Sequence, residues 1–192
     1  MPFERAQPQG AIRMTAKDTG SSLWDYAVGL YSEPGVSLSC LDIQEQCGVD
    51  VPLLLFGAWM GSQGFVLTAT DCRDIDARIR DWRIEVIQAL RRVRRRMKSG
   101  PPPAPSERTK RLRSAVKAAE LDAERIELEV LEALGDDLRN GPGGEATACI
   151  AGNMRVVLHH FQGTAQADTA EEALERIIEI ATRLQGSAPS PG

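Results

Sequence analysis

The densest group of residues that could do chemistry is a run of cations, Arg91-Arg-Val-Arg-Arg-Arg-Met-Lys98. Clustered guanidinium and ammonium groups bind phosphates or carboxylates when the protein itself does not neutralise them. A short Pro-rich stretch separates this run from further cations. The candidate anion- or partner-binding residues are Arg91, Arg92, Arg94, Arg95, Arg96, Lys98, Lys110, Arg111 and Arg113.

Two interpretations of this cluster stay open. Runs of charge are usually solvated or paired within a fold, and cations also suit the C-terminal end of a helix, so this interpretation is favoured. In an antiparallel helix pair, however, Arg91–Lys98 should lie opposite Glu107–Arg113, which is itself basic. Part of the cluster should then remain unpaired near the connecting loop, where it could bind an anion.

Basic and acidic residues are also distributed unevenly along the whole chain. Between Arg73 and Lys117 there are fifteen basic and five acidic residues. Met1–Cys72 has three basic and eight acidic residues, and Ala118–Gly192 has five and fourteen. A basic centre between acidic flanks indicates either internal pairing or one exposed face that attracts anions.

The aromatic residues offer a second candidate site. They could line an apolar pocket of the kind that holds small ligands. Core packing explains the same residues more simply, since large aromatic side chains dominate the interiors of helical domains. The candidate pocket residues are Trp24, Tyr31, Phe56, Trp59 and Trp82.

Metal and cofactor motifs are not found in the sequence. His159 and His160 are adjacent, so their side chains diverge and cannot chelate one ion by themselves. The four cysteines form no Cys-x-x-Cys pair and are expected to be buried, reduced thiols. There is no Gly-rich phosphate loop and no nucleophile elbow. We therefore expect no cofactor, no metal and no catalytic residues, and lean towards a protein that is not an enzyme.

Apolar residues recur every three or four positions along most of the chain, which predicts an all-α protein. Capping residues and Gly or Pro breaks divide this pattern into segments. The helices expected are Leu23–Tyr31, Val36–Cys47, Val51–Met60, a bent one from Thr68 or Thr70 to Lys98, Ser106–Leu134, Glu145–Phe161 and one behind a Thr169–Glu172 capping box.

Three features of these helices predict how they pack. Val51–Met60 is apolar on every side, which is typical of a central helix, and Gly57 with Gly61 should let another backbone come close. A four-three seam of coiled-coil type runs along Ser106–Leu134 and should pack on the preceding helix. Its members are Leu112, Val116, Ala119, Ala123, Ile126, Val130 and Ala133. Glu145–Phe161 could also form a hairpin, although a helix is favoured.

The predicted architecture is a compact all-α domain with a long antiparallel helical hairpin and a C-terminal helical appendage. We expect a disordered leader at 1–20, the main domain at 21–139, a C-terminal extension at 145–185 and a disordered tail at 186–192. The longest apolar stretch is about half of the ~20 residues that a membrane-spanning helix needs. No signal peptide is evident, so a cytoplasmic protein without membrane contact is expected.

Several landmarks resemble a small bacterial family seen mainly in proteobacteria. They include Ser22-Leu-Trp-Asp-Tyr-Ala27, Pro34-Gly-Val36, Leu53-Leu-Leu-Phe-Gly-Ala-Trp-Met-Gly61, Trp82-Arg-x-x-Val86 and Val116-Lys-Ala-Ala-Glu120. The resemblance covers about residues 21–134 and implies a short all-helical protein of unknown function. It implies no activity, and the part after Asn140 does not share the pattern.

These observations favour a non-enzymatic helical binding or adaptor protein with an unknown protein partner. Its contact surface should be the Arg-rich end of the hairpin or the amphipathic C-terminal helix. Nucleic-acid or phosphate binding through the arginines is the first alternative, and a helical enzyme with an aromatic pocket is the second. A homodimer is compatible with the sequence, which does not identify a partner or a molecular activity.

Overall fold

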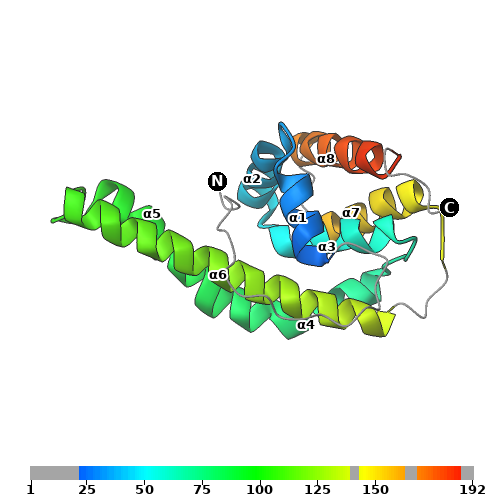
Figure 1. Ribbon diagram of the computed structural model, residues 1–192, viewed down its shortest axis with the longest axis horizontal. Helices are drawn as coiled ribbons and strands as arrows, with labels where there is room; N and C mark the ends of the chain where they lie inside the picture. The colour runs from blue at the N-terminus through cyan, green and yellow to red at the C-terminus, as the bar shows by residue number, and fades with distance from the viewer. Residues whose placement is uncertain (1–21, 139–142, 163–167, 187–192) are drawn as a thin grey trace.

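The computed structural model describes residues 22–138, 143–162 and 168–186, and these residues are almost entirely helical (Figure 1). The only β-type pairing within these described ranges is an isolated bridge between Phe65 and Gly143. The elements are α1 (Leu23–Tyr31), α2 (Val36–Cys47), α3 (Val51–Ser62), α4 (Ala69–Trp82), a π-helical turn η1 (Arg83–Ile87), α5 (Gln88–Ser99), α6 (Glu107–Leu138), α7 (Ala146–Gln162) and α8 (Asp168–Gly186). The predicted all-α class is therefore confirmed.

Local signals in the sequence set most helix ends. Ser22 caps α1 by accepting a hydrogen bond from the Asp25 amide, and Asp50 caps α3 by accepting one from the Leu53 amide. Thr68 and Asp71 form a reciprocal capping box at the start of α4. Gly48 ends α2 with φ of 67°, a left-handed conformation that glycine adopts without steric cost. Each of these ends agrees with the sequence prediction to within a few residues.

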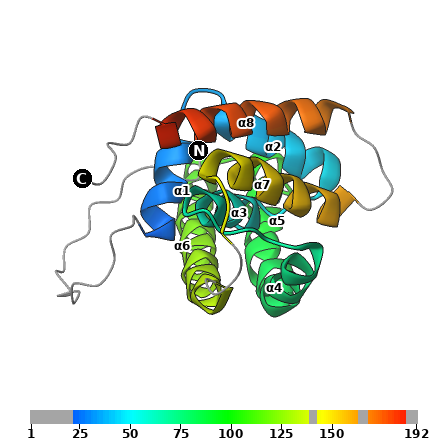
Figure 2. The ribbon, with the colours of Figure 1, turned by 90° about the vertical axis from the view of Figure 1, so that its right-hand side faces the viewer.

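Helix α3 lies at the centre of the molecule. Its residues from Pro52 to Gly61 are all buried, as the apolar pattern predicted. Helix α7 packs along it, and Figure 2 shows α3 between α7 and the hairpin of α4 to α6. At Gly61 an added Cβ would lie 2.4 Å from the Ile150 amide nitrogen, so the two backbones approach closely only because residue 61 has no side chain.

Helices α4, η1 and α5 form one long bent arm that runs antiparallel to α6. The π-helical turn at Arg83–Ile87 provides the bend, since it inserts an extra residue into the helical repeat. Figure 1 shows α5 and the first part of α6 extending well beyond the remaining helices. We call α4, η1, α5 and α6 the hairpin, its end at Pro101–Pro105 the tip, and the other helices the body.

Helices α7 and α8 are part of the same hydrophobic core as α1 to α3. The Ile150, Met154 and Leu158 side chains of α7 are buried in it. Helix α8 contributes Leu174 and Ile177, and lies against α2 and α7 (Figure 2). The apolar face of the amphipathic helix α8 is therefore buried against other helices of the body. Of the two alternatives for Glu145–Phe161, the helix is correct.

Three local predictions need correction. Thr169 lies inside α8 rather than at its cap, and its hydroxyl donates to the Gln46 side chain. Helix α6 continues past Leu134 to Leu138, and Gly135 in this last part lies close against the side chains of Phe56, Met60 and Trp59.

The third correction concerns the coiled-coil seam of α6. It is only partly buried, with Leu112 and Ile126 exposed, because just two helices meet along most of its length. The leader predicted at 1–20 and most of the tail lie outside the described residues.

Candidate anion-binding groove

The hairpin arginines divide into an inner set that faces the body and an outer set at the surface. Arg91 belongs to the inner set, and its Nε and Nη2 atoms lie 2.9 Å from Glu120 Oε1 and 2.6 Å from Glu124 Oε1. Arg94 also binds Glu120, through Nη2 at 3.1 Å and through a second contact from Nε to Oε2. A single buried carboxylate thus bridges two guanidinium groups.

This pairing differs from the register expected from the sequence, which placed Arg91–Lys98 opposite Glu107–Arg113. The acidic partners lie further along α6, and their carboxylates face the body rather than water. Buried carboxylates are stable only beside a cation, so opposite charges determine which residues meet. The acids recur at positions 120, 124 and 127, a helical spacing that places them on one face of α6 but does not show that this face is buried.

The outer cations lie nearer the tip. Arg92, Arg96, Lys98 and Arg111 are exposed, and none of them has an ion pair with another described residue. Lys110 lies 2.6 Å from Glu107 in an exposed pair. Arg113 is half-buried, and its Nε has no hydrogen-bond partner among the described atoms. Arg95 makes one long contact of 3.4 Å with Glu45 of α2, a pair in which both side chains are more than half exposed.

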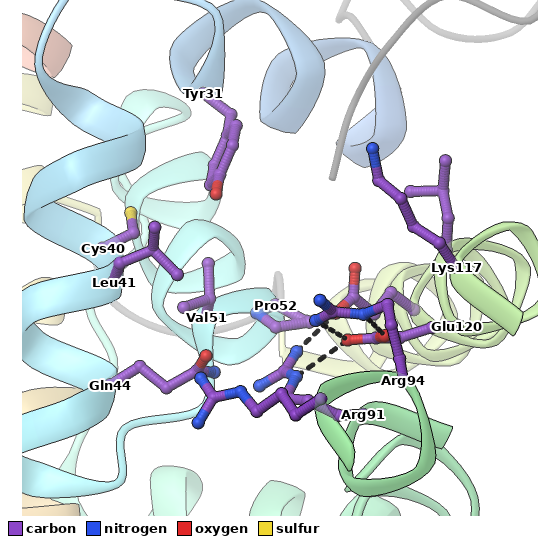
Figure 3. Close-up of a pocket in the computed structure, with 13 residues that line it drawn as sticks. Tyr31, Cys40, Leu41, Gln44, Val51, Pro52, Arg91, Arg94, Lys117 and Glu120 are labelled. Carbon is purple, nitrogen blue, oxygen red and sulfur yellow. Dashed lines mark hydrogen bonds and ion pairs between the residues drawn. The ribbon is translucent and has the colours of Figure 1, made fainter. Parts of the chain in front are cut away.

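A groove of about 220 Å³ lies between the body and the hairpin, above the Arg91–Glu120 contact (Figure 3). Figure 3 shows Tyr31 with its hydroxyl directed into this space, and Arg94 and Lys117 on the hairpin side. We call this space the cationic groove. Its lining residues are Tyr31, Cys40, Leu41, Gln44, Val51, Pro52, Arg91, Arg94, Arg95, Lys117, Glu120, Leu121 and Glu124.

A second depression of about 530 Å³ adjoins the cationic groove and shares Gln44, Arg91 and Arg95 with it. It is also lined by Arg83 and Arg92, and by Asp50 at the start of α3. Positive side chains therefore line both hollows on the hairpin side.

Three buried carboxyl groups lie beneath these hollows. Burial raises the pKa of Glu124 to about 7, although Arg91 favours the ionised form. Asp50 and Glu127 form a close pair, and burial together with mutual repulsion raises the pKa of Glu127 far above its usual range. As a carboxylate, Glu127 would have no hydrogen-bond donor for either oxygen. As a neutral acid it can donate to Asp50, so the pair shares one proton.

Asp76 forms a separate cluster between α4 and α7. Its carboxylate is 2.5 Å from Arg83 Nη1, 2.8 Å from Arg80 Nη2 and 3.0 Å from His160 Nε2. Burial opposes its ionisation, but the hydrogen bonds from Arg80, His160 and Arg83 prevail and lower the pKa of Asp76. The Arg83 guanidinium also lies over the Phe161 ring, 5.1 Å from its centroid. This saturated cluster ties the arm to α7.

The five aromatic residues proposed for a pocket do not surround one space. Phe56 and Trp59 are buried in the core with ring centroids 6.1 Å apart. Trp82 lies on the hairpin, where its indole Nε1 donates to the Ala123 carbonyl at 3.1 Å. The Trp24 ring is covered by the Arg125 guanidinium, 5.0 Å from its centroid. Of the five, only Tyr31 lines the cationic groove.

Sequence reasoning did not single out several groove residues. Lys117 and Gln44 were not identified, because neither belongs to a motif that marks a binding site. Nothing in the sequence marks Glu120, Glu124 and Asp50 as buried groups. Across the described ranges, no group of three or more His, Cys, Asp or Glu residues is placed to hold a metal ion.

Comparison with known proteins adds a family to this description. The model of the family described as "Protein of unknown function (DUF2390)" matches residues 22–131, which is more than half of the chain. The chain belongs to this family. The resemblance noted in the sequence is thereby confirmed, and the match runs from α1 to Leu131 within α6. Neither a curated protein nor a solved structure matches the chain.

The family match includes every residue that lines the cationic groove, whereas α7 and α8 lie beyond it. Among the helices described, none combines the length and the apolar character needed to cross a lipid bilayer.

Proposed function

We propose that the protein is a non-enzymatic binding or adaptor protein that recognises an acidic segment of a partner protein in the cationic groove. One observation carries the proposal, namely the excess of cations over anions in the groove lining. Four cations, Arg91, Arg94, Arg95 and Lys117, meet only two carboxyl groups, Glu120 and Glu124. Because the pKa of Glu124 is about 7, this group carries only part of its charge at neutral pH.

The apolar side of the groove favours a peptide over a bare anion. Leu41, Val51, Pro52 and Leu121 line it together with the cations. A phosphate or free carboxylate gains nothing from such a wall, whereas an acidic side chain next to an apolar one uses both surfaces. The polar side chains of Tyr31 and Gln44 add hydrogen-bonding groups that can orient a peptide backbone.

The proposal is tested by recovering partners from native lysate, with and without nuclease, and identifying them by mass spectrometry. Arg95→Gln with Lys117→Gln removes two groove charges that are not needed for the buried pairs. We expect the double variant to bind at least tenfold more weakly to a partner that the wild type retains after nuclease treatment.

Arg78→Gln with Arg176→Gln is the matched control, because both residues are exposed cations away from the groove. Partner affinity unchanged in the groove variant, or reduced equally in the control, would contradict the proposal.

The outer cations support a second candidate, nucleic-acid binding at the tip and the adjoining parts of α5 and α6. Residues 88–117 contain eleven basic residues and one acidic residue, Glu107, which is already paired. The tip projects from the body, so a phosphate backbone could reach it without obstruction. Arg94 is a poor choice for testing this candidate, because it is engaged with Glu120.

Replacing Arg92, Arg96 and Lys98 by Gln separates the two candidates. For a nucleic-acid-binding protein, this triple variant should lose most of its retention on DNA or RNA. The dependence of affinity on salt should also become shallower, by about one unit of log–log slope for each phosphate that the variant no longer neutralises. Retention that is equal for wild type and variant at every salt concentration argues against the tip as a nucleic-acid site.

A helical enzyme with an aromatic pocket receives less support. The aromatic residues are dispersed between the core and the surface, and Phe56 and Trp59 fill space rather than border it. The saturated Asp76 cluster has the composition of an acid–base site, but each of its groups is engaged with another.

A further inference from the structure

The hairpin carries an apolar stripe on the face directed away from the body. In α6, Leu112, Ala119, Ile126 and Ala133 recur every seven residues and therefore form one line along the helix. We call the large exposed apolar residues of this face the hairpin stripe. They are Trp82 at 37% exposure, Val93 at 50%, Leu112 at 56%, Ile126 at 44% and Val130 at 43%.

The position of the stripe follows from helical geometry. Helix α6 contacts the body through Glu124, Leu128 and Leu131, which are buried. At about 100° per residue, Ile126 points roughly half a turn away from Glu124. Figure 2 shows the hairpin as the outermost layer, with the body on one side of it and no described helix on the other. In a unit of only two helices, each helix covers one side of the apolar heptad positions of the other. The opposite side of these positions stays exposed.

Exposed apolar side chains elsewhere are arranged differently. Leu38 and Leu41 on α2, Val66 before α4, Ile84 in η1 and Leu184 on α8 are also exposed, but no more than two of them share one element. Five large exposed side chains on the neighbouring helices α4, α5 and α6 make the type of surface that marks an interface. The seven-residue period further indicates that the covering element is helical.

Charge along the hairpin indicates which helices cover the stripe. The tip half, residues 88–117, has eleven basic residues and one acidic residue. The second half of α6, residues 118–138, has eight acidic residues and one basic residue, Arg125. The hairpin is therefore positive at one end and negative at the other. Its best electrostatic complement is the same hairpin turned end to end.

We propose that a second copy of this chain covers the hairpin stripe, with the two hairpins antiparallel and forming a four-helix bundle. A two-fold axis near Ala119 places the positive tip of each copy against the negative half of the other. Arg111 of one copy then lies opposite Glu129 of the other. Ala115 and Ala119 near the axis are small enough for the two α6 helices to approach closely. The cationic groove faces the body, so this inference is independent of the proposed function.

The mass of the full chain in solution, measured by light scattering after size exclusion, tests the proposal. We expect a dimer for the wild type. Ile126→Lys places a charge in the centre of the stripe and should shift the mass to that of a monomer, or weaken dimerisation at least tenfold. Leu38→Lys is the matched control, because Leu38 is more exposed than Ile126 but lies on α2; it should leave the dimer intact.

Charge reversal tests the antiparallel arrangement. One variant carries Arg108→Glu with Arg111→Glu at the tip, and another carries Asp122→Arg with Glu129→Arg in the acidic half. Each alone should dimerise at least tenfold more weakly than the wild type, because like charges then face each other where the two hairpins meet. An equimolar mixture of the two should form a mixed dimer, since opposite charges face each other again.

Circular dichroism checks that each variant keeps its helical content. A wild-type chain that is monomeric at every concentration overturns the proposal. So does a dimer that Ile126→Lys leaves unchanged. A dimer that survives both charge reversals without any preference for the mixed pair overturns the antiparallel arrangement.

Discussion

Glu120 holds two arginines of the hairpin at once, in a position where water reaches only a small part of its side chain. The Glu120 side chain is 7% exposed, and those of Arg91 and Arg94 are 19% and 24% exposed. The contacts with both arginines outweigh the cost of burial and lower the pKa of Glu120. These three residues therefore attach α5 to α6 beside the cationic groove.

Replacing Glu120 with Gln should destabilise the protein more than such a small change in side-chain shape suggests. The substitution conserves shape but leaves two poorly hydrated guanidinium groups without a counter-charge, a situation that costs about 2–4 kcal/mol in partly buried pairs. Urea denaturation measures the free energy of unfolding. Glu175→Gln is the control, because the exposed pair of Glu175 with Arg155 at 2.7 Å lies outside the hairpin and should contribute less than about 1 kcal/mol. Equal decreases in stability for both variants would contradict the assigned role of Glu120.

Glu127 is expected to make the protein less stable as the pH rises. Its pKa is raised in the folded state, so the folded protein keeps a proton that the unfolded chain releases above about pH 4.5. Stability contributed by this proton is complete below pH 4.5 and is lost as the pH rises towards the raised pKa. The slope for one proton is at most about 1.4 kcal/mol per pH unit.

Glu127→Gln removes the proton but keeps the amide able to donate to Asp50. The variant should be more stable than the wild type at pH 8, and its free energy of unfolding should vary less between pH 5 and pH 8. Denaturation at a series of pH values provides the measurement, with Glu175→Gln again as control. A variant less stable than the wild type at pH 8 would show that Glu127 is ionised in the folded protein.

At the scale of elements, the contact between α3 and α7 depends on glycine. An added Cβ at Gly57 would meet Val157 at 3.4 Å, which is an ordinary contact, whereas at Gly61 it would meet the Ile150 backbone at 2.4 Å. Backbone atoms cannot move aside as a flexible side chain can. Helix α7 would have to shift as a whole.

Gly61→Ala should therefore reduce the free energy of unfolding by about 2 kcal/mol or more. Gly152→Ala is the opposite case, because Gly152 lies within α7 with nothing within 4 Å of an added Cβ. There the substitution should stabilise the protein by about 0.5–1 kcal/mol through its effect on helix propensity. Thermal unfolding followed by circular dichroism compares the two, and a neutral Gly61→Ala would mean that α7 packs less closely on α3.

Asn153 joins the same two helices and also fixes the loop after α3. Its side-chain nitrogen donates to the Gly57 carbonyl at 3.0 Å and to the Phe65 carbonyl at 2.9 Å, while its oxygen accepts from the Leu67 amide at 2.7 Å. One buried amide thus satisfies three backbone groups. This explains why a polar residue lies on the buried face of α7.

At the scale of the whole molecule, the part matched by the family model is not the whole core. The match ends at Leu131, whereas Ile150, Met154, Leu174 and Ile177 from α7 and α8 complete the enclosure of α3. A chain that stops at Leu138 would expose the apolar surface that these helices cover. Large exposed apolar patches cause aggregation in proteins that have no partner to cover them.

We expect the chain truncated after Leu138 to be insoluble, or to bind hydrophobic dyes strongly and lose its near-ultraviolet circular dichroism while remaining partly helical. Addition of a peptide with the sequence of α7 and α8 should restore part of the tertiary signal. A truncated chain that stays soluble and keeps a cooperative thermal transition would show that α1 to α6 fold without the last two helices.

The amino-acid sequence by itself determined the helices and most of their ends. Ser22, Asp50, Thr68 and Gly48 act on backbone groups only a few residues away, so their effects can be predicted without knowing what lies opposite. The same holds for the central place of α3, because a helix with no polar face has no stable position at the surface.

Only the tertiary structure decided which charges are buried and which remain available. Glu120, Glu124 and Glu127 look like ordinary surface residues in the sequence, and Arg94 looks as accessible as Arg96. Their environments differ because burial and pairing depend on which helix lies opposite and in what register, and these are set by contacts between residues far apart in the chain. Periodicity within one helix does not indicate that register. The free-energy cost of an unpaired buried charge restricts it to registers in which each buried carboxylate lies beside a cation.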